Sequence, residues 1–140
     1  MVRISNLELL KILREDARKP FLEIAKLLGV SETAVRKRVR KLEESGIIRK
    51  YTVEVDPKKI GFNINVLIGI DTVPERFISA LERLKDMEEV VSLYSSSGDH
   101  MILAECWFRS SKELSDFVRK LESIDGVIRV CPAIILEKVK

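Results

Sequence analysis

The chain has 140 residues, 46% of them hydrophobic and 34% charged, with a formal net charge of +3. This composition is typical of a soluble, folded chain that forms one domain or two small ones, and no apolar run approaches the roughly 20 residues of a membrane span. The first residues lack the continuous apolar core of a secretory signal, so we expect a cytoplasmic protein with no membrane partner.

The first 46 residues have the pattern of three short helices. A Ser-x-x-Glu capping box begins the first helix at Ser5, and leucines follow it on a helical period. Pro20 suits the first turn of a second helix, which Gly29 ends. Ser31 is a good N-cap for a third helix that runs to about Ser45. The pattern therefore predicts a helix, a tight turn and a further helix.

The third helix contains a basic run, in which five of the six residues from 36 to 41 are Lys or Arg. Val35, Val39 and Leu42 fall together on a helical wheel, so the basic side chains face away from the helix bundle. A merely solvated surface is the alternative explanation. However, the second helix of a helix-turn-helix is the unit that enters the major groove, and residues 1–56 hold 13 Lys/Arg against 9 Asp/Glu. We therefore predict double-stranded DNA as a partner.

A strand-like segment and a polar linker follow the three helices. Residues 47–55, IIRKYTVEV, alternate in the manner of a strand, and we expect a hairpin-like wing there that touches the flanking DNA backbone. Residues 56–61, DPKKIG, are turn-rich and form the predicted linker between a DNA-binding domain at 1–55 and a second domain at 62–140. The predicted DNA contacts are Ser31, Thr33, Arg36, Lys37, Arg40, Lys41, Arg49 and Lys50.

Residues 62–140 contain an internal repeat. A shift of 37 residues aligns Leu84 with Leu121 and Val90 with Val127, and each copy has the pattern strand, amphipathic helix, strand. This pattern predicts a ferredoxin-like βαββαβ unit, with strand order 4-1-3-2 and both helices on one face of an antiparallel sheet, so the whole chain is α+β. The expected strands are 62–71, 90–96, 101–108 and 127–136, and the expected helices are 75–87 and 111–123.

The predicted sheet has apolar residues on both faces. One face of the first strand packs under the helices and consists of Ile64, Val66, Ile68 and Ile70. The opposite face also offers apolar side chains, namely Leu67, Met101, Leu103 and Trp107. A contiguous apolar patch on a small domain usually marks an interface, and a second copy of the chain is the simplest partner. We therefore predict a dimer that forms through this second face.

The two cysteines, Cys106 and Cys131, fall on the predicted third and fourth strands. In the expected strand order one strand separates them, so their backbones lie roughly 9–10 Å apart, beyond the reach of a disulfide. No second Cys or His stands at metal-ligand spacing. We therefore expect two free thiols, no metal site and no cofactor.

The N-terminal motifs resemble a known family. REDAR, IAKLLGVSETAVRKRVRKLEESGII and DPKKIG, in this order, resemble the winged helix-turn-helix and linker of the Lrp/AsnC (feast/famine) transcription regulators of bacteria and archaea. The repeat resembles the effector-sensing domain of that family. The resemblance implies a sequence-specific transcription regulator that forms dimers through its C-terminal sheets, assembles further into tetramers or octamers, and senses an amino acid or related metabolite. The absence of Gln and the many Lys, Glu and Ile residues favour a heat-adapted source, so with the resemblance we expect an archaeal or thermophilic regulator.

The turn between the second and third strands differs from the pattern of the family. Members usually carry Gly-Asp-aromatic-Asp there, whereas this chain has GDHM. The resemblance places the effector at Gly98, Asp99, His100 and Met101. The last strand has Cys131 and Pro132 near the position where the family usually has Thr, so the identity of the effector stays open.

Two other classes of function remain as alternatives. Some siroheme decarboxylases resemble this family in fold, and SSSGDH places Ser, Asp and His in one turn. Neighbouring turn residues rarely face each other in the geometry of a nucleophile and its base, so we expect no enzyme activity. An oligomeric sensor that does not bind DNA is the third class, and the basic helix argues against it.

Overall fold

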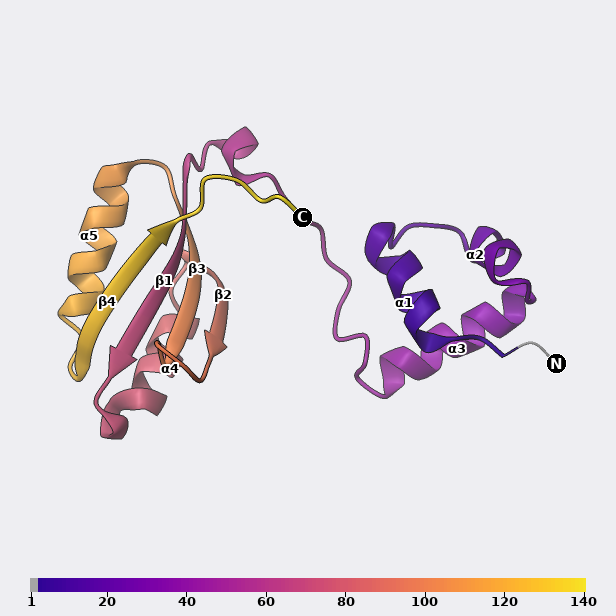
Figure 1. Cartoon of the computed structure of the whole chain (residues 1–140), viewed down its shortest axis with the longest axis horizontal. Helices are drawn as coiled ribbons and strands as arrows, with labels where there is room; N and C mark the ends of the chain where they lie inside the picture. Colours follow the sequence, from indigo (N-terminus) through magenta and orange to yellow (C-terminus); the bar gives the residue numbers. More distant parts are fainter. Residues whose placement is uncertain (1–2) are drawn as a thin grey trace. The chain divides into compact units, whose positions relative to one another are not determined.

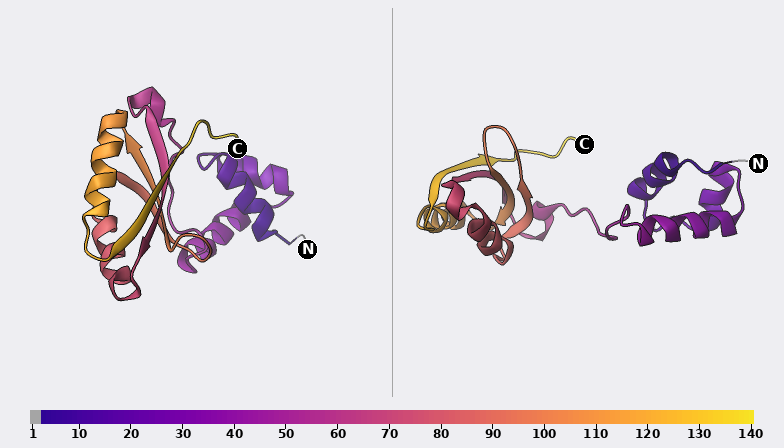
Figure 2. Two further views of the ribbon diagram at one scale, coloured as in Figure 1. Left: turned by 60° about the vertical axis from the view of Figure 1, so that its left-hand side comes forward. Right: turned by 90° about the horizontal axis from the view of Figure 1, so that it is seen from below.

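The computed structural model describes residues 3–140, which form two compact units (Figures 1 and 2). The first unit ends at Glu54 and the second runs from Val55 to Lys140. No helix in the described part of the chain has the length and apolar character that a membrane crossing requires.

The N-terminal unit consists of the three expected helices, α1 (Asn6–Glu15), α2 (Phe21–Leu28) and α3 (Glu32–Glu44). The predicted caps are confirmed at two helix starts. The Ser5 hydroxyl accepts the N–H of the third helical residue of α1 at 3.3 Å, and the Ser31 hydroxyl accepts the equivalent N–H of α3 at 3.1 Å. Both serines therefore satisfy backbone donors that a helix start leaves free.

One small core holds the three helices together. Val35, Val39 and Leu42 of α3 are buried, as the helical wheel predicted. Gly29 ends α2 with a φ of 68°, a left-handed conformation that costs glycine little, and so allows the tight turn into α3. The buried residues of this core are Leu9, Leu13, Ile24, Ala25, Val35, Val39 and Leu42.

The prediction of a strand and hairpin-like wing at residues 47–55 is wrong. This segment forms neither helix nor strand, and several of its apolar side chains are exposed, Val53 to 78% and Ile47 to 56%. A strand needs a neighbour for its backbone groups, and no strand pairs with this segment within residues 3–140. The segment is instead tied to α3, because the Ile48 N–H donates to the Leu42 carbonyl at 3.0 Å and the Tyr51 hydroxyl donates to Glu43 at 2.9 Å.

The C-terminal unit is a four-stranded sheet with two helices on one face (Figures 1 and 2). The strand order β2-β3-β1-β4, with antiparallel pairs throughout, confirms the predicted ferredoxin-like unit. The expected linker forms a short 3-10 helix, Pro57–Ile60. The remaining elements are β1 (Ile64–Thr72), a 3-10 turn (Pro74–Arg76), α4 (Phe77–Lys85), β2 (Val90–Ser95), β3 (Ile102–Phe108), α5 (Ser111–Glu122) and β4 (Val127–Ile134).

The face of the sheet under the helices forms the second core. Val66, Ile68 and Ile70 are fully buried there, as their alternation predicted. Met101 differs from the prediction that placed it on the opposite face. It precedes β3, outside the strand alternation, and its side chain packs against the helix-side core. The second face of the sheet therefore lacks one of its four expected apolar residues.

Strand β1 lies between the strands of the two cysteines, as predicted. Cys106 of β3 pairs with Val66 of β1, whereas Cys131 of β4 pairs with Gly69 of β1. Cys106 is fully buried, and both thiols are free. Burial, together with the nearby carboxylates, raises the pKa of Cys106 to about 12.

We expect the Cys106 thiol to resist alkylation at pH 8 in the folded protein and to react readily after unfolding. The reason is that the thiolate is the reactive form, and burial suppresses it. Iodoacetamide labelling of a Cys131→Ser variant, followed by mass spectrometry, isolates this thiol. Equal rates in the folded and unfolded states would contradict the burial of Cys106. A Cys106–Cys131 disulfide in the non-reduced wild type would contradict the strand order.

Candidate DNA-recognition helix and effector turn

The outer face of α3 is cationic and exposed. Burial of one side of the helix in the N-terminal core turns Thr33, Arg36, Lys37 and Arg40 outward, and all four are exposed. Within residues 3–140, Lys37, Arg40 and Lys41 make no ion pair, so their charges are available to a polyanion. Such an arrangement on the second helix of a helix-turn-helix suits the major groove.

The five basic residues of the run differ in what they contact. Arg36 is held by its own domain, since its guanidinium lies 2.9 Å from the Glu32 carboxylate and 5.2 Å from the centre of the Phe21 ring. Arg38 is half-buried and donates to the Asn6 side chain of α1 at 3.1 Å. Arg38 therefore joins two helices, which agrees with its absence from the predicted DNA contacts.

Arg49 and Lys50 lie just after α3 on the irregular segment that replaces the expected wing. Both are exposed, and within the described residues neither makes an ion pair. The segment starts from the C-terminal end of α3, where Ile48 packs against the core. These two cations are thus held next to the C-terminal end of α3 without a hairpin.

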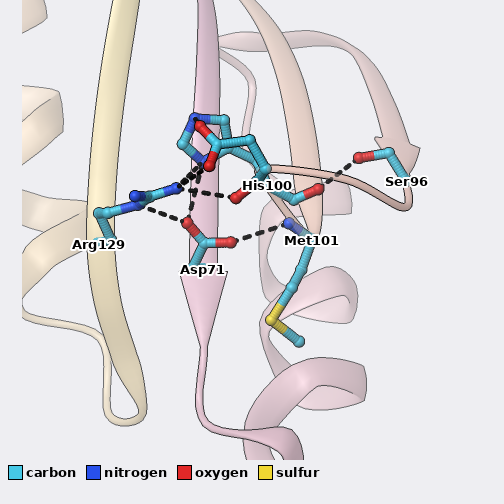
Figure 3. Close-up of polar contacts among 6 residues, drawn as sticks. Asp71, Ser96, His100, Met101 and Arg129 are labelled. Carbon is cyan, nitrogen blue, oxygen red and sulfur yellow. Dashed lines mark hydrogen bonds and ion pairs between the residues drawn. The ribbon is translucent and has the colours of Figure 1, made fainter.

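The β2–β3 turn is tied to β1 and β4 by a set of polar contacts, which we call the turn cluster: Asp71, Asp99, His100, Met101 and Arg129 (Figure 3). Asp71 of β1 is only 8% exposed and forms the centre of the cluster. Its carboxylate lies 2.9 Å from His100 Nδ1, 2.9 Å from the Met101 N–H nitrogen and 2.9 Å from Arg129 Nε. One carboxylate thus joins β1, the turn and β4.

Arg129 also holds the other side of the turn. Its Nη2 donates to the Asp99 carbonyl at 2.8 Å and lies 3.2 Å from the Asp99 carboxylate. Because Nδ1 of His100 faces the Asp71 carboxylate, Nδ1 carries the proton and donates. The Arg129 Nη2 atom, 3.2 Å from the same Nδ1, is then a close neighbour without a hydrogen bond to it.

Glycine at position 69 makes room for this arrangement. A Cβ on Gly69 would overlap the His100 ring, which lies directly on the β1 backbone. Gly98, Asp99, His100 and Met101 are consecutive in this turn, and their role in effector binding stays a prediction. Their neighbours Gly69, Asp71 and Arg129 were not predicted. The available signal was an acidic residue inside an apolar strand, IGIDT.

The cluster shows no nucleophile paired with a base. The Ser96 hydroxyl donates to the His100 carbonyl at 2.6 Å, whereas the His100 ring faces Asp71. In the part of the chain that the structure describes, no three His, Cys, Asp or Glu side chains gather as metal ligands. These contacts hold the turn in one conformation.

Burial alone would raise the pKa of Asp71, but the hydrogen bonds from His100, Met101 and Arg129 outweigh it and hold the pKa below its ordinary value. The folded state therefore binds the Asp71 proton more weakly than the unfolded chain does. This carboxylate stabilises the fold above the unfolded pKa of about 3.9, and the contribution is lost as the pH falls through the lower folded pKa.

We expect Asp71→Asn to lower the stability of the C-terminal unit by about 1–2 kcal/mol at pH 7. An amide has a single acceptor oxygen, so its NH2 group must face either the Met101 N–H or the donors of His100 and Arg129. The difference from wild type should shrink below about pH 4. Urea unfolding at each pH, followed by the fluorescence of Trp107, the single tryptophan, measures this difference in the free energy of unfolding.

Asp125→Asn is the matched control for this experiment. Asp125 also pairs with an arginine, at 3.0 Å, but its side chain is 82% exposed, so we expect a loss below about 1 kcal/mol. A loss at Asp71 that stays constant between pH 7 and pH 3 would contradict the assigned direction of its pKa shift.

The second face of the sheet keeps three of its predicted apolar residues. Leu67 is 37% exposed, and Leu103 and Trp107 are half-buried, while both helices of the unit lie on the other face (Figure 2). Trp107 stacks at a tilt against Phe62, with ring centres 5.8 Å apart, and its Nε1 donates to Glu105 at 3.2 Å. These contacts give the face a defined shape.

Two family models match the chain. The AsnC-type helix-turn-helix domain matches residues 5–43, and the Lrp/AsnC ligand binding domain matches residues 65–140. The HTH-type transcriptional regulator LrpA of Pyrococcus horikoshii is 56% identical over 133 residues, which cover 94% of each chain. LrpA1 of Halobacterium salinarum is 37% identical with the same coverage. These ranges include nearly all of α3 and the whole turn cluster.

Solved structures agree with this assignment. E. coli AsnC superimposes with a TM-score of 0.82 at 30% identity, over 99% of this chain and 95% of that chain. The feast or famine regulatory protein from M. tuberculosis, complexed with L-methionine, superimposes with a TM-score of 0.80 at 28% identity, over 94% of this chain and 90% of that chain. The α+β fold and the resemblance inferred from the sequence are confirmed. This chain belongs to the Lrp/AsnC family of helix-turn-helix transcription regulators.

Proposed function

We propose that this chain regulates transcription by placing α3 in the major groove of double-stranded DNA. The observation that supports this most is the exposed cationic face of α3, on the second helix of a helix-turn-helix, with three cations that have no partner in the described residues. The proposed contacts are those predicted from the sequence: Ser31, Thr33, Arg36, Lys37, Arg40, Lys41, Arg49 and Lys50. Arg and Lys of this set would pair with phosphates and with guanine edges.

A gel shift with the DNA upstream of the chain's own coding sequence tests this function. We expect retention at nanomolar protein, and a loss of affinity of about a thousandfold or more between 50 and 200 mM salt if six or more phosphates are contacted. An unrelated DNA of the same length and composition is the control. Equal affinity for both DNAs at every salt concentration would contradict sequence-specific recognition.

We further propose that the second face of the sheet forms the dimer interface. Leu67, Leu103 and Trp107 form an apolar patch on the side that the helices leave open, and a twofold axis would let the same patch cover itself. The resemblance to the family adds the expectation of tetramers or octamers. Sedimentation equilibrium over a hundredfold range of concentration determines the size of the assembly.

The β2–β3 turn is the proposed place of effector binding. The M. tuberculosis relative was solved with L-methionine, and the matched ligand binding domain includes residues 98–101 of this chain. We propose that Gly98, Asp99, His100 and Met101 contact an amino acid or related metabolite between subunits. Selection of bound fragments from random DNA, with and without each amino acid, would show an effector as a change in the recovered sites.

An enzyme is the less favoured alternative. The relatives that match over nearly the whole chain are transcriptional regulators by name, and the His100 ring is hydrogen-bonded to a carboxylate with no hydroxyl as its partner. A siroheme decarboxylase would show tetrapyrrole absorbance in the purified protein, and we expect none. The proposed place of action is the cytoplasm, where bacterial and archaeal DNA lies.

A further inference from the structure

One pair of charges at the start of α3 places an acid beside the cationic face, while the other exposed acids of this helix, Glu43 and Glu44, lie at its far end. Glu32 is the first residue of α3, its side chain is 45% exposed, and its carboxylate lies 2.9 Å from the Arg36 guanidinium, one turn further along the helix. The Arg36 guanidinium also lies over the Phe21 ring of α2, at 5.2 Å. Two independent contacts therefore hold this arginine in one place.

The stability of the helix does not explain the position of Glu32 fully. Exposed i,i+4 ion pairs stabilise proteins little, and an acid in the first turn of a helix adds only a small interaction with the helix dipole. Against DNA the same carboxylate is unfavourable, because it repels phosphates and reduces the net charge of the recognition face. A contact with the edges of base pairs would offset this cost.

The edges of base pairs can supply that contact. A carboxylate accepts hydrogen bonds from the N4 amino group of cytosine, and an arginine pairs bidentately with O6 and N7 of guanine. A glutamate and an arginine one helical turn apart, already 2.9 Å from each other, can meet a cytosine and a guanine that are neighbours in the major groove. Phe21 limits the number of positions that the guanidinium can take, and so lowers the entropy lost on binding.

We propose that Glu32 and Arg36 form a unit that reads a G·C-containing step, with Glu32 as a determinant of specificity and Phe21 as a positioning residue for Arg36. This inference rests on the proposed DNA-binding function. The free cations Lys37 and Lys41 then supply charge for the backbone. Repulsion between the Glu32 carboxylate and the phosphates lowers the affinity for all DNA. A hydrogen bond to a base amino group offsets this loss only at sites where such a group faces the carboxylate.

Selection from random double-stranded DNA by the wild type and by Glu32→Gln tests this division of roles. We expect the wild type to require G·C at a position in each half-site that Glu32→Gln no longer requires, because the amide prefers adenine. The ratio of specific to non-specific affinity should fall about tenfold, while non-specific affinity rises several-fold. Arg36→Lys should lose the guanine preference with an unchanged salt dependence, since the charge remains.

Glu15→Gln is the matched control, since it makes the same charge change at an exposed position of α1. Thermal unfolding of each variant shows that the fold is intact. A wild type that binds specific sites, together with a Glu32→Gln variant that selects the same sites at the same ratio, would overturn this inference alone. A wild type without any sequence preference would overturn the proposed function and this inference together.

Discussion

Replacement of Arg36 and Arg40 by alanine in one variant is expected to abolish sequence-specific DNA binding without unfolding the protein. Both side chains are exposed on α3, so their loss leaves the core of Val35, Val39 and Leu42 unchanged. Each bidentate pairing of arginine with guanine contributes roughly 1–3 kcal/mol, so two losses reduce specific affinity by up to about four orders of magnitude. Fluorescence anisotropy with a selected operator measures this directly.

The stability cost of this double variant should be small. Arg36 loses an exposed ion pair and a ring contact, which together amount to about 1 kcal/mol or less, and Arg40 has no ion pair among the described residues. Arg83→Ala with Lys85→Ala, in the last turn of α4, removes the same charge from the other unit and serves as the control. Wild-type affinity in a folded double variant would mean that α3 is not the recognition helix.

A charge at position 107 is expected to disrupt the dimer and, through it, DNA binding. Trp107 is half-buried in the chain alone and stacks on Phe62, and the proposed second copy would cover it completely. Trp107→Glu then buries a second carboxylate beside Glu105, which is costly enough to raise the dissociation constant of the dimer about a hundredfold or more. Sedimentation of the variant measures this change.

The effect on DNA follows from symmetry. Two recognition helices related by a twofold axis require inverted half-sites, and both reach the same side of the duplex when these are separated by about 10 bp or a multiple of it. A monomer would bind a single half-site, so affinity should fall toward the weak, strongly salt-dependent level of non-specific binding, with a dissociation constant of about 10⁻⁴–10⁻⁶ M. Footprinting of the variant would show the loss of paired protection.

Ile78→Glu is a suitable control for the change at Trp107. Ile78 lies on α4, on the helix-covered side of the sheet, and is 67% exposed, so a charge there meets water. We expect a wild-type dimer from this variant. A Trp107→Glu protein that remains a dimer and still protects two half-sites would show that the subunits meet elsewhere.

Local rules account for the elements that were predicted correctly. Ser5 and Ser31 are caps whose hydrogen bonds span three residues, so the helix starts depend on neighbours in sequence alone. The 37-residue repeat and the two-residue alternation in the first strand are periodic patterns of apolar residues, and the same periods reappear in the folded elements. These features were enough to predict the ferredoxin-like unit, its strand order and the exposed face of α3.

Residues 47–55 show where local pattern fails. Alternation of apolar and polar residues favours an extended chain, but a strand exists only when a second strand supplies hydrogen bonds, and none within residues 3–140 does so here. Met101 shows a related failure. It lies outside the ladder of β3, so the parity rule that assigned it to the second face did not apply, and it packs against the helix-side core.

The three N-terminal helices, the cationic face of α3 and the βαββαβ order could be predicted because each depends on spacing along the chain, and the family could be predicted from the motifs of its N-terminal part. The surroundings of the β2–β3 turn could be seen only in the folded chain. Asp71 lies 29 residues from His100 and 58 from Arg129, and they meet because β1 pairs with both β3 and β4, with Gly69 leaving room for the imidazole. The contact of Arg36 with Phe21 has the same origin, since packing of α3 on α2 sets the distance between a cation and a ring of different helices.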